Sequence, residues 1–455
     1  MALNEAISRH KGCRDSFVRN LVKGTIRQTI TLDHITGMLA SNGLKGIKTR
    51  TLIILRMGLY AIREMDSVPD HAAVNEAVAL ARKTARGTDR FINAVLRSYI
   101  RRRDEFEPEF IKGIGDPVKR LSVQYSMPED LVSLITSQYG EEAESILRGL
   151  NEPPEVILRV NTLKTTKEQL IADLAGASIK AEDAIDGEML TEEGKLSDAD
   201  RQHIGAGELH PEEGYVRGAA VKASGRGIIE SDLYRKGHFT VQSLSSMLAV
   251  SALAPEPGSK VLDMCAAPGG KSTMMAEMMG NEGSVTACDI HEHRLELIKA
   301  SAARTGTDII ETRLMDGTQY DSSLEGQFDY VLADVPCSGL GVMSTKPEIR
   351  LRTDVSEYAG LTDTQLEILK NAFRYTRPGG RICYSTCTLN RDENEGVVRR
   401  FMDRRASCEQ EEDSHGAWDL ARNNESGFAR IVEMRTILPY NNVIGFYYCI
   451  IEKSF

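Results

Sequence analysis

Two cysteines in short polar motifs carry the clearest chemical signal in the sequence. Cys337 lies in the run DVPCSGLG (334–341) and Cys387 in the run YSTCTLNRDENE (384–395). A single cysteine is usually a small buried core residue. These two each follow a predicted strand, and doubly wound sheets bind their ligands in the crevice outside the carboxyl ends of the strands. We therefore interpret both thiols, together with Asp334 at the end of the strand before Cys337, as functional groups.

A loop of small residues after another predicted strand is suited to binding a ligand through its backbone. The loop opens a helix, whose first N–H groups have no partner within the helix. Two glycines allow a ligand to approach the backbone closely. The loop is neither the G-x-G-x-x-G fingerprint of dinucleotide sites nor a Walker A loop. Its residues are Cys265, Ala266, Ala267, Pro268, Gly269, Gly270 and Lys271.

Acidic residues stand at the ends of three predicted strands. Asp289 follows the small-residue loop by about 20 residues, a spacing at which a carboxylate can accept hydrogen bonds from ribose hydroxyls. Asp316 follows the next strand, where an adenine edge would lie, and Asp334 ends the strand after that. One such residue is often only a turn or a helix cap, but three in register favour a ligand-binding role.

The elements that must position these residues alternate in the second half of the chain. Short apolar strands separated by helices are typical of a parallel α/β sheet covered on both faces. We predict strands at 260–264, 284–289, 309–314, 329–334, 381–386 and 444–452, and helices at 271–279, 291–305 and 363–376.

The first half of the chain has a different pattern. Apolar residues recur at helical spacing up to about residue 120, as in Leu52, Leu55 and Leu59, and predict an all-helical bundle. Further along, 156–160 is a predicted strand and 167–175 a predicted helix. The segment 181–213 has 11 acidic residues and no apolar periodicity, so we expect a surface insertion. The predicted domains are a helical domain (1–125), a small α+β domain with this insertion (126–238) and an α/β domain (239–455).

Charge and composition limit the class of protein. The net charge is −10, but residues 1–120 carry +9 and the remainder −19. A basic helical domain is compatible with binding a phosphate backbone, although a solvated helical surface would give the same charge. No stretch is long and apolar enough to span a membrane, and the N-terminus lacks a signal-peptide pattern. We expect a monomeric cytoplasmic protein.

The cysteine spacing argues against disulfides and metal. Eight cysteines in 455 residues include no paired C-x-x-C units, which favours reduced thiols. Cys383 and Cys387 form one C-x3-C, but no second pair of His or Cys lies nearby to complete a metal site. We expect no metal.

Four motifs carry a resemblance to a known family. CAAPGGKST (265–273), DVPCSGLG, KPEIR (346–350) and YSTCTLNRDENE closely resemble the Sun/Fmu family of RNA cytosine-5 methyltransferases, over residues 150–455. The segments VPDHAAVNEAV (68–78) and FINAVLR (91–97) resemble the helical NusB-like RNA-binding domain. The combination resembles the RsmB-type members of the family, which act on bacterial 16S ribosomal RNA.

The resemblance implies a Rossmann-like catalytic domain that uses S-adenosylmethionine to methylate C5 of a cytosine. It assigns residues 265–271, Asp289, Asp316 and Asp334 to the cofactor and target-base region. It makes Cys387 the catalytic nucleophile and Cys337 the residue that helps to break the covalent adduct down.

Three departures from the family pattern concern the surroundings of the site. The chain starts about one helix short of the usual NusB-like domain. The usual Gln-Asp pair before the catalytic domain is Gln242-Ser243, and the usual Asp-Gly near the final strand is Ile444-Gly445. We expect these departures to affect RNA docking more than the chemistry.

The implied reaction explains the need for cysteine. C5 of cytosine is a poor nucleophile, and addition of a thiolate at C6 turns the ring into an enamine. Because a free cysteine has a pKa near 8.5, Cys387 should lie where positive charge or N–H donors favour the anion. Asp334 could bond the N3 or N4 edge of the base as charge develops there. The cytosine must also be unpaired or flipped out of its helix.

Three other functions deserve comparison with this one. A non-catalytic RNA-binding assembly factor on the same fold would not need the two cysteine motifs, and both are intact. An enzyme acting on transfer RNA would share every catalytic motif, and only the NusB-like half favours ribosomal RNA. A nicotinamide dehydrogenase is disfavoured because the glycine fingerprint is absent.

Overall fold

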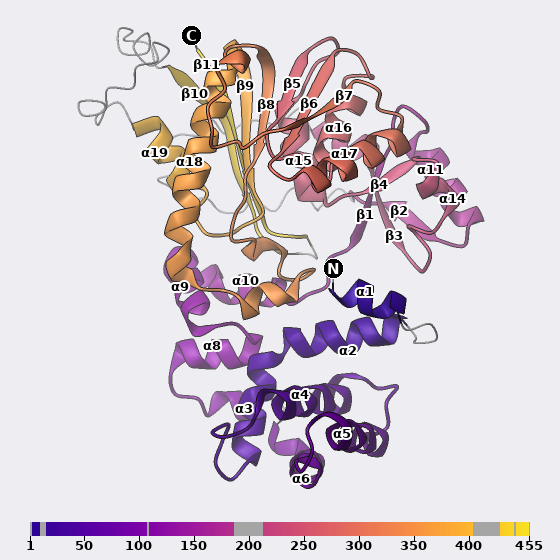
Figure 1. Ribbon diagram of the computed structural model, residues 1–455, viewed down its shortest axis with the longest axis vertical. Helices are drawn as coiled ribbons and strands as arrows, with labels where there is room; N and C mark the ends of the chain where they lie inside the picture. Colours follow the sequence, from indigo (N-terminus) through magenta and orange to yellow (C-terminus); the bar gives the residue numbers. More distant parts are fainter. Residues whose placement is uncertain are drawn as a thin grey trace. The chain divides into compact units, whose positions relative to one another are not determined.

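The computed structural model describes residues 2–9, 15–106, 109–185, 213–403, 428–440 and 443–454 (Figure 1). The chain divides into two compact units, each with its own core. One unit comprises Met1–Asn151 together with Thr345–Val355. The other comprises Glu152–Ser344 together with Ser356–Phe455.

The first unit is helical, as predicted. Leu55 and Leu59, two of its periodic apolar residues, are buried in a single core with Leu32, Val74 and Leu96. In the described part of this unit, the α-helices are α1 (Ala2–Arg9), α2 (Asp15–Arg27), α3 (Thr29–Leu39), α4 (Thr49–Glu64), α5 (Asp70–Thr84), α6 (Asp89–Arg101), α7 (Glu109–Lys112), α8 (Pro117–Tyr125), α9 (Glu129–Tyr139) and α10 (Ala143–Gly149).

A segment from late in the sequence also belongs to this unit. Thr345–Val355 contains the short helix η5 (Pro347–Leu351), which packs against α2. Arg350 of this segment is buried, and its Nη1 donates to the carbonyl oxygens of Arg27 (2.5 Å) and Ser126 (3.2 Å) and to Oδ1 of Asn151 (3.0 Å). The KPEIR motif is therefore held by the ends of helices in the helical unit.

The second unit begins with a small antiparallel sheet of strand order β2-β3-β1-β4. The predicted strand and helix are confirmed as β1 (Val156–Val160) and α11 (Lys167–Gly176). The remaining described elements are β2 (Lys180–Asp183), α13 (Glu213–Ala219), β3 (Ala220–Ser224), α14 (Asp232–Arg235) and β4 (Phe239–Val241).

The predicted insertion at 181–213 is too wide at both of its ends. Residues 186–212 lie outside the described residues, but Ala181 and Asp183 belong to β2, where they pair with Ala223 and Val221 of β3. Residue 213 already begins α13. Hydrogen bonding to β3 thus makes a strand of a sequence whose acidic residues alone suggest a loop.

The larger sheet contains the predicted α/β pattern. Among the described residues its strand order is β10-β11-β9-β8-β5-β6-β7, with the five strands from β9 to β7 parallel. Its strands are β5 (Lys260–Asp263), β6 (Ser284–Asp289), β7 (Ile310–Leu314), β8 (Phe328–Asp334), β9 (Thr376–Thr386), β10 (Ala429–Ile437) and β11 (Phe446–Lys453). The predicted strands are confirmed, whereas the antiparallel edge strand β10 was not predicted.

Helices cover both faces of this sheet (Figure 1). Successive side chains of a strand point to opposite faces, so Val261 packs in one core with α15 and α16, and Leu262 packs in the other with α18. The described α-helices of this domain are α15 (Leu244–Leu253), α16 (Gly270–Met278), α17 (Glu292–Thr305), α18 (Tyr358–Tyr375) and α19 (Glu395–Met402). The carboxyl ends of β5, β6, β8 and β9 consequently meet at one edge of the sheet.

Candidate active site

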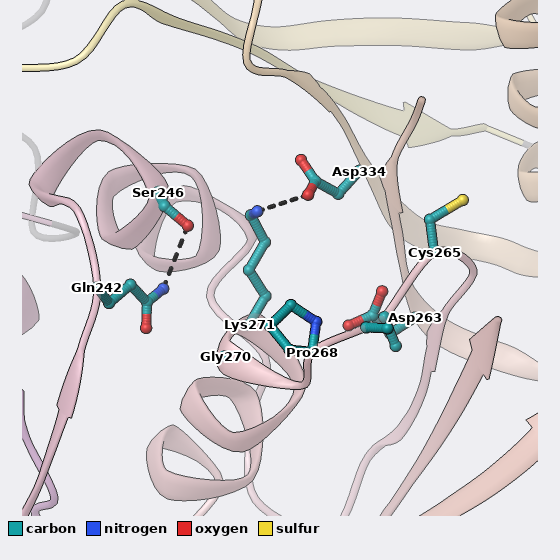
Figure 2. A pocket seen from close by; sticks show the side chains of 10 residues that line it. Gln242, Ser246, Asp263, Cys265, Pro268, Gly270, Lys271 and Asp334 are labelled. Carbon is teal, nitrogen blue, oxygen red and sulfur yellow. Dashed lines mark hydrogen bonds and ion pairs between the residues drawn. The ribbon is translucent and has the colours of Figure 1, made fainter. Parts of the chain in front are cut away.

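A cavity of about 140 Å³ opens where β5 runs into α16. Figure 2 shows its lining side chains. The cavity is lined by Gln242, Ser246 and Asp263, which were not predicted as site residues, and by the following predicted site residues: Cys265, Ala266, Ala267, Pro268, Gly270, Lys271 and Asp334.

Gly269 shapes the loop although it is not among the residues that line the cavity. Its φ of 98° lies in the left-handed region, and a Cβ at this position would be 3.2 Å from the Cα of Ile298. Glycine alone accepts both conditions easily. The loop can therefore turn tightly into α16 and leave the helix N-terminus accessible from the cavity.

Lys271 and Asp334 form an ion pair at the wall of the cavity (Figure 2). Lys271 Nζ lies 2.6 Å from Asp334 Oδ2, and the hydroxyl of Ser385 donates to Asp334 Oδ1 at 2.8 Å. Burial works to lower the pKa of Lys271, but the negative charges of Asp334, Asp263 and Cys387 outweigh it and raise this pKa. The lysine thus stays protonated and holds the Asp334 carboxylate in place.

The two predicted catalytic thiols are in contact. Cys337 Sγ lies 3.3 Å from Cys387 Sγ. The hydrogen bond with Cys387, burial and the nearby Glu393 raise the pKa of Cys337 well above its ordinary value. Cys337 therefore remains a neutral thiol near pH 7 and can donate its proton in a hydrogen bond to the sulfur of Cys387.

A buried carboxylate ties the two cysteine loops together. Glu393 is fully buried and accepts hydrogen bonds from the backbone N–H (2.8 Å) and hydroxyl (2.5 Å) of Ser338, from Gln365 (3.0 Å) and from Asn390 (3.2 Å). Ser338 follows Cys337 directly, and its hydroxyl also lies 2.6 Å from that of Thr388, the neighbour of Cys387. The network fixes the separation of the two sulfurs.

The close packing of two glycines supports the same loops. Gly341 N donates to the carbonyl oxygen of Cys387 (3.0 Å), and Gly445 N donates to that of Gly341 (3.0 Å). A Cβ on Gly341 would lie 2.1 Å from the carbonyl oxygen of Gly445. The departure at Ile444-Gly445 therefore keeps the glycine on which this contact depends.

Two predicted cofactor residues, Asp289 and Asp316, are not among the residues that line the cavity. Asp289 ends β6, is 3% exposed, and pairs with Arg294 at 3.1 Å. Asp316 lies beyond the end of β7 and accepts from the backbone N–H (3.0 Å) and hydroxyl (2.7 Å) of Thr318. Both stand at strand ends as predicted, so their ligand-binding role stays a prediction.

Asp263 and Glu393, which were not predicted as site residues, had usable signals in the sequence. Asp263 directly precedes the small-residue loop, and Glu393 lies within the YSTCTLNRDENE motif. Ser243, where the family pattern has Asp, caps α15 by accepting from Ser246 N at 3.3 Å. The substitution preserves a helix cap, since Ser and Asp serve this purpose equally well.

Asp263 is expected to make the stability of the fold depend on pH. Burial raises the pKa of this carboxyl to about 7, although the Ser272 hydroxyl, 2.7 Å away, acts in the opposite direction. The unfolded chain loses this proton near pH 4, so the folded state holds more protons between pH 4 and 7 and loses stability as the pH rises through that window.

Asp263→Asn should remove this dependence. Between pH 4.5 and 8, the free energy of unfolding of the variant should gain about 3 kcal/mol relative to the native protein. Urea denaturation at a series of pH values measures the difference, with Asp173→Asn on the surface of α11 as the control. Parallel pH curves for native protein and Asp263→Asn would contradict the assignment.

Among the described residues, no helix is long and apolar enough to cross a membrane, and no group of three or more His, Cys, Asp or Glu side chains is arranged to hold a metal ion.

Three family profiles match separate parts of the chain. The family described as 16S rRNA methyltransferase RsmB/F matches residues 250–452. The NusB family matches residues 2–101, and the ferredoxin-like domain of RsmF/B-like methyltransferases matches residues 127–190. These matches follow the order in which the helical part, the small sheet and the larger sheet occur.

Whole-length relatives carry consistent names. A probable ribosomal RNA small subunit methyltransferase B from Bacillus subtilis (strain 168) is 33% identical over 459 residues, which cover 99% of this chain and 92% of the relative. The ribosomal RNA small subunit methyltransferase B of Proteus mirabilis (strain HI4320) is 30% identical and covers 85% of this chain and 83% of the relative.

Solved structures share the fold at lower identity. A methyltransferase homologue from Pyrococcus horikoshii is 21% identical, with a TM-score of 0.55 over 76% of this chain and 99% of that chain. NSun6 from Pyrococcus horikoshii is 23% identical, with a TM-score of 0.54 over 72% of this chain and 98% of that chain.

Proposed function

The chain belongs to the RsmB/F family of 16S rRNA methyltransferases, and from this membership we propose that it methylates C5 of a cytosine in 16S ribosomal RNA through a covalent bond between Cys387 and C6. The observation that carries the proposal is the pair of thiols 3.3 Å apart, on loops that follow adjacent parallel strands. A fold retained only for binding RNA would not need two sulfurs held in contact by a buried carboxylate.

The methyl donor that we propose is S-adenosylmethionine, and the residues fit it. The glycine turn leaves the start of α16 open to a ligand, and Asp289 offers a carboxylate at the end of β6 for ribose hydroxyls. Cys265–Lys271, Asp289, Asp316 and Asp334 would hold it. When bound, the cofactor supplies a methyl group on a sulfonium centre.

Cys387 and Asp334 have different roles in the proposed covalent step. The Cys387 thiolate adds to C6 of the cytosine and forms an S–C6 bond, which gives C5 the electron density for methylation. Asp334, held as a carboxylate by Lys271 and Ser385, would accept a hydrogen bond from the N4 amino group of the cytosine and so orient the ring. After C5 has lost its proton to a base, the S–C6 bond breaks and returns its electron pair to Cys387.

Cys337 assists the last step. As a neutral thiol in contact with the Cys387 sulfur, it can donate a hydrogen bond to the departing thiolate. A hydrogen bond to an anion is stronger than one between neutral groups. The contact therefore stabilises the leaving group more than the adduct and favours release of the methylated RNA.

We further propose three functional domains, with boundaries at 1–125, 126–238 and 239–455. The basic charge of residues 1–120 supports a role of the helical part in binding the phosphate backbone. Folded ribosomal RNA would then be recognised largely by its shape.

Transfer of a methyl group to ribosomal RNA tests the proposal. The purified protein is incubated with S-adenosylmethionine and either 16S ribosomal RNA or transfer RNA, and bisulfite sequencing then maps 5-methylcytosine. We expect a defined cytosine in 16S RNA to become methylated. Methylation confined to transfer RNA, or at a position other than cytosine C5, would overturn the proposed substrate.

Asp289→Ala should weaken cofactor binding while leaving RNA affinity nearly unchanged. The ribose hydroxyls would lose a charged acceptor, which corresponds to about a 10- to 100-fold higher Kd for S-adenosylmethionine. Calorimetric titration measures this constant. Glu296→Ala, which removes an exposed acidic residue of the following helix, is the control. An unchanged Kd for Asp289→Ala would mean that this strand end does not contact the cofactor.

A further inference from the structure

Arg159 of β1 lies in the interior of the second unit and reaches from the small sheet to helix α16. It is fully buried, and its guanidinium bonds both carboxylate oxygens of Glu277 (3.0 and 2.8 Å), the hydroxyl of Thr273 (3.0 Å) and the carbonyl oxygen of Gly270 (2.6 Å). Its remaining described partner is the side-chain oxygen of Gln242. The arginine thus touches the first turn of α16 and a residue that lines the cavity.

These contacts decide which way the amide of Gln242 faces. A guanidinium has only donors, so the oxygen of the Gln242 amide must face Arg159. Its nitrogen then lies on the other side, 3.3 Å from the hydroxyl of Ser246 at the cavity wall (Figure 2) and 3.7 Å from the sulfur of Met274. Gln242 is 8% exposed, so its amide cannot turn freely into solvent. Both acceptors of its N–H groups are neutral, and the Met274 sulfur is a weak one, so a carboxylate that enters the cavity beside Gln242 would compete well for them.

The sheet order places this donor at one end of the cavity. Helix α15 begins just after Gln242 and packs against β9 and β11. Those strands lie on the β8 side of β5, whereas Asp289 ends β6 on the opposite side. If the ribose of a bound cofactor lay at β6, an amino-acid end directed away from Asp289 would point toward Gln242.

We propose that Gln242 binds the carboxylate of the amino-acid part of S-adenosylmethionine, and that Arg159 is the positioning residue that holds its amide in the binding orientation. The inference rests on the proposed function, because it takes the cavity to be the cofactor site. It adds a donor from outside the small-residue loop and links β1 of the small sheet to cofactor affinity.

Two ligands that differ only in the amino-acid part test the role of Gln242. S-adenosylhomocysteine carries that part, and 5′-methylthioadenosine lacks it. Gln242→Glu keeps the size of the side chain but replaces the donor with a negative charge, so the Kd for S-adenosylhomocysteine should rise about 10-fold or more. The Kd for 5′-methylthioadenosine should change less than about twofold, whereas Asp289→Ala should weaken both ligands.

The outcomes separate the inference from the proposed function. Equal losses for the two ligands, or no loss for S-adenosylhomocysteine, would overturn the role of Gln242. If the native protein bound neither ligand, the cofactor site itself would be wrong and both proposals would fall. Calorimetric titration gives all of these constants on the full chain.

A double substitution separates the positioning role of Arg159 from its contribution to the stability of the fold. Removing one member of a buried ion pair leaves an unpaired charge, but replacing both by apolar residues can be nearly neutral for folding. The double variant Arg159→Met/Glu277→Leu should melt close to the native temperature. Its Kd for S-adenosylhomocysteine should nevertheless be about 10-fold higher than native, because the amide of Gln242 has lost the guanidinium that orients it.

The matched control is Arg56→Met/Asp33→Leu, which replaces a two-point ion pair (2.7 and 2.7 Å) in the helical unit. It should leave the affinity for S-adenosylhomocysteine unchanged. Native affinity in a stably folded Arg159→Met/Glu277→Leu protein would mean that Arg159 serves only the fold and would overturn its positioning role.

Discussion

Replacing Cys387 by alanine is expected to abolish methyl transfer and to leave cofactor affinity unchanged. Without this thiolate no S–C6 bond can form, and the cytosine ring is not activated at C5. The Cys387 side chain is not among those that line the cofactor cavity, so calorimetric titration with S-adenosylmethionine should give the native Kd. No covalent protein–RNA product should appear on a denaturing gel.

Replacing Cys337 by alanine should have the opposite visible result. Addition to C6 and methyl transfer can still proceed, but the departing Cys387 thiolate loses the hydrogen bond that stabilises it. A protein–RNA conjugate that survives denaturing electrophoresis should therefore accumulate.

Cys383→Ala is the matched control for both variants. Cys383 lies in β9, the strand that leads directly to Cys387, but it is fully buried. Its thiol is directed at the carbonyl oxygen of Ala249. This variant should turn over without accumulating a conjugate. A conjugate formed by Cys387→Ala and not by Cys337→Ala would reverse the roles of the two sulfurs. Native turnover in both variants would rule out the covalent mechanism.

Glu393→Gln should cause the second large loss, because it breaks the network that joins the two cysteine loops. The carboxylate accepts donors at both of its oxygens: Ser338 N and Gln365 at one, the Ser338 hydroxyl and Asn390 at the other. A glutamine amide can accept at only one end, and its NH₂ must face donors at the other. The free energy of unfolding should fall by about 3 kcal/mol.

The loss should also appear in the rate. If the two sulfurs lose their fixed separation, kcat should fall by about 100-fold, while the Kd for S-adenosylmethionine stays close to native. Glu367→Gln on α18 is the control, because its half-exposed carboxylate bonds only Lys370 among the described residues, and it should change neither quantity. A Glu393→Gln protein with native kcat would show that this network serves stability alone.

Strand-end chemistry could be predicted from the sequence because parallel strands align their carboxyl ends. Asp334 and Cys387 are about 50 residues apart in the chain, yet the alternation of strands and helices was enough to bring their loops together. The same reasoning predicted that the loop from Cys265 to Lys271 would lie beside Asp334, and six residues of this loop line one cavity together with Asp334.

The sequence does not predict which partners a buried polar side chain meets in the folded protein. Nothing in the local sequence of Arg159 indicates that it pairs with Glu277, which lies 118 residues away. The motif around Glu393 does not show which donors this carboxylate meets, and it is fully buried because four donors converge on it. The edge strand β10 was missed because its partner β11 supplies its hydrogen bonds.

The path of the segment Thr345–Val355 has a consequence for building chimaeras. A cut after Asn151 would leave this segment on the C-terminal fragment, although it belongs to the helical unit. Arg350 would then lose its acceptors on Arg27, Ser126 and Asn151, and the helix ends that they terminate would lose a donor. Any exchange of the helical half between relatives must therefore include residues 345–355, so that two separate stretches of the gene are exchanged together.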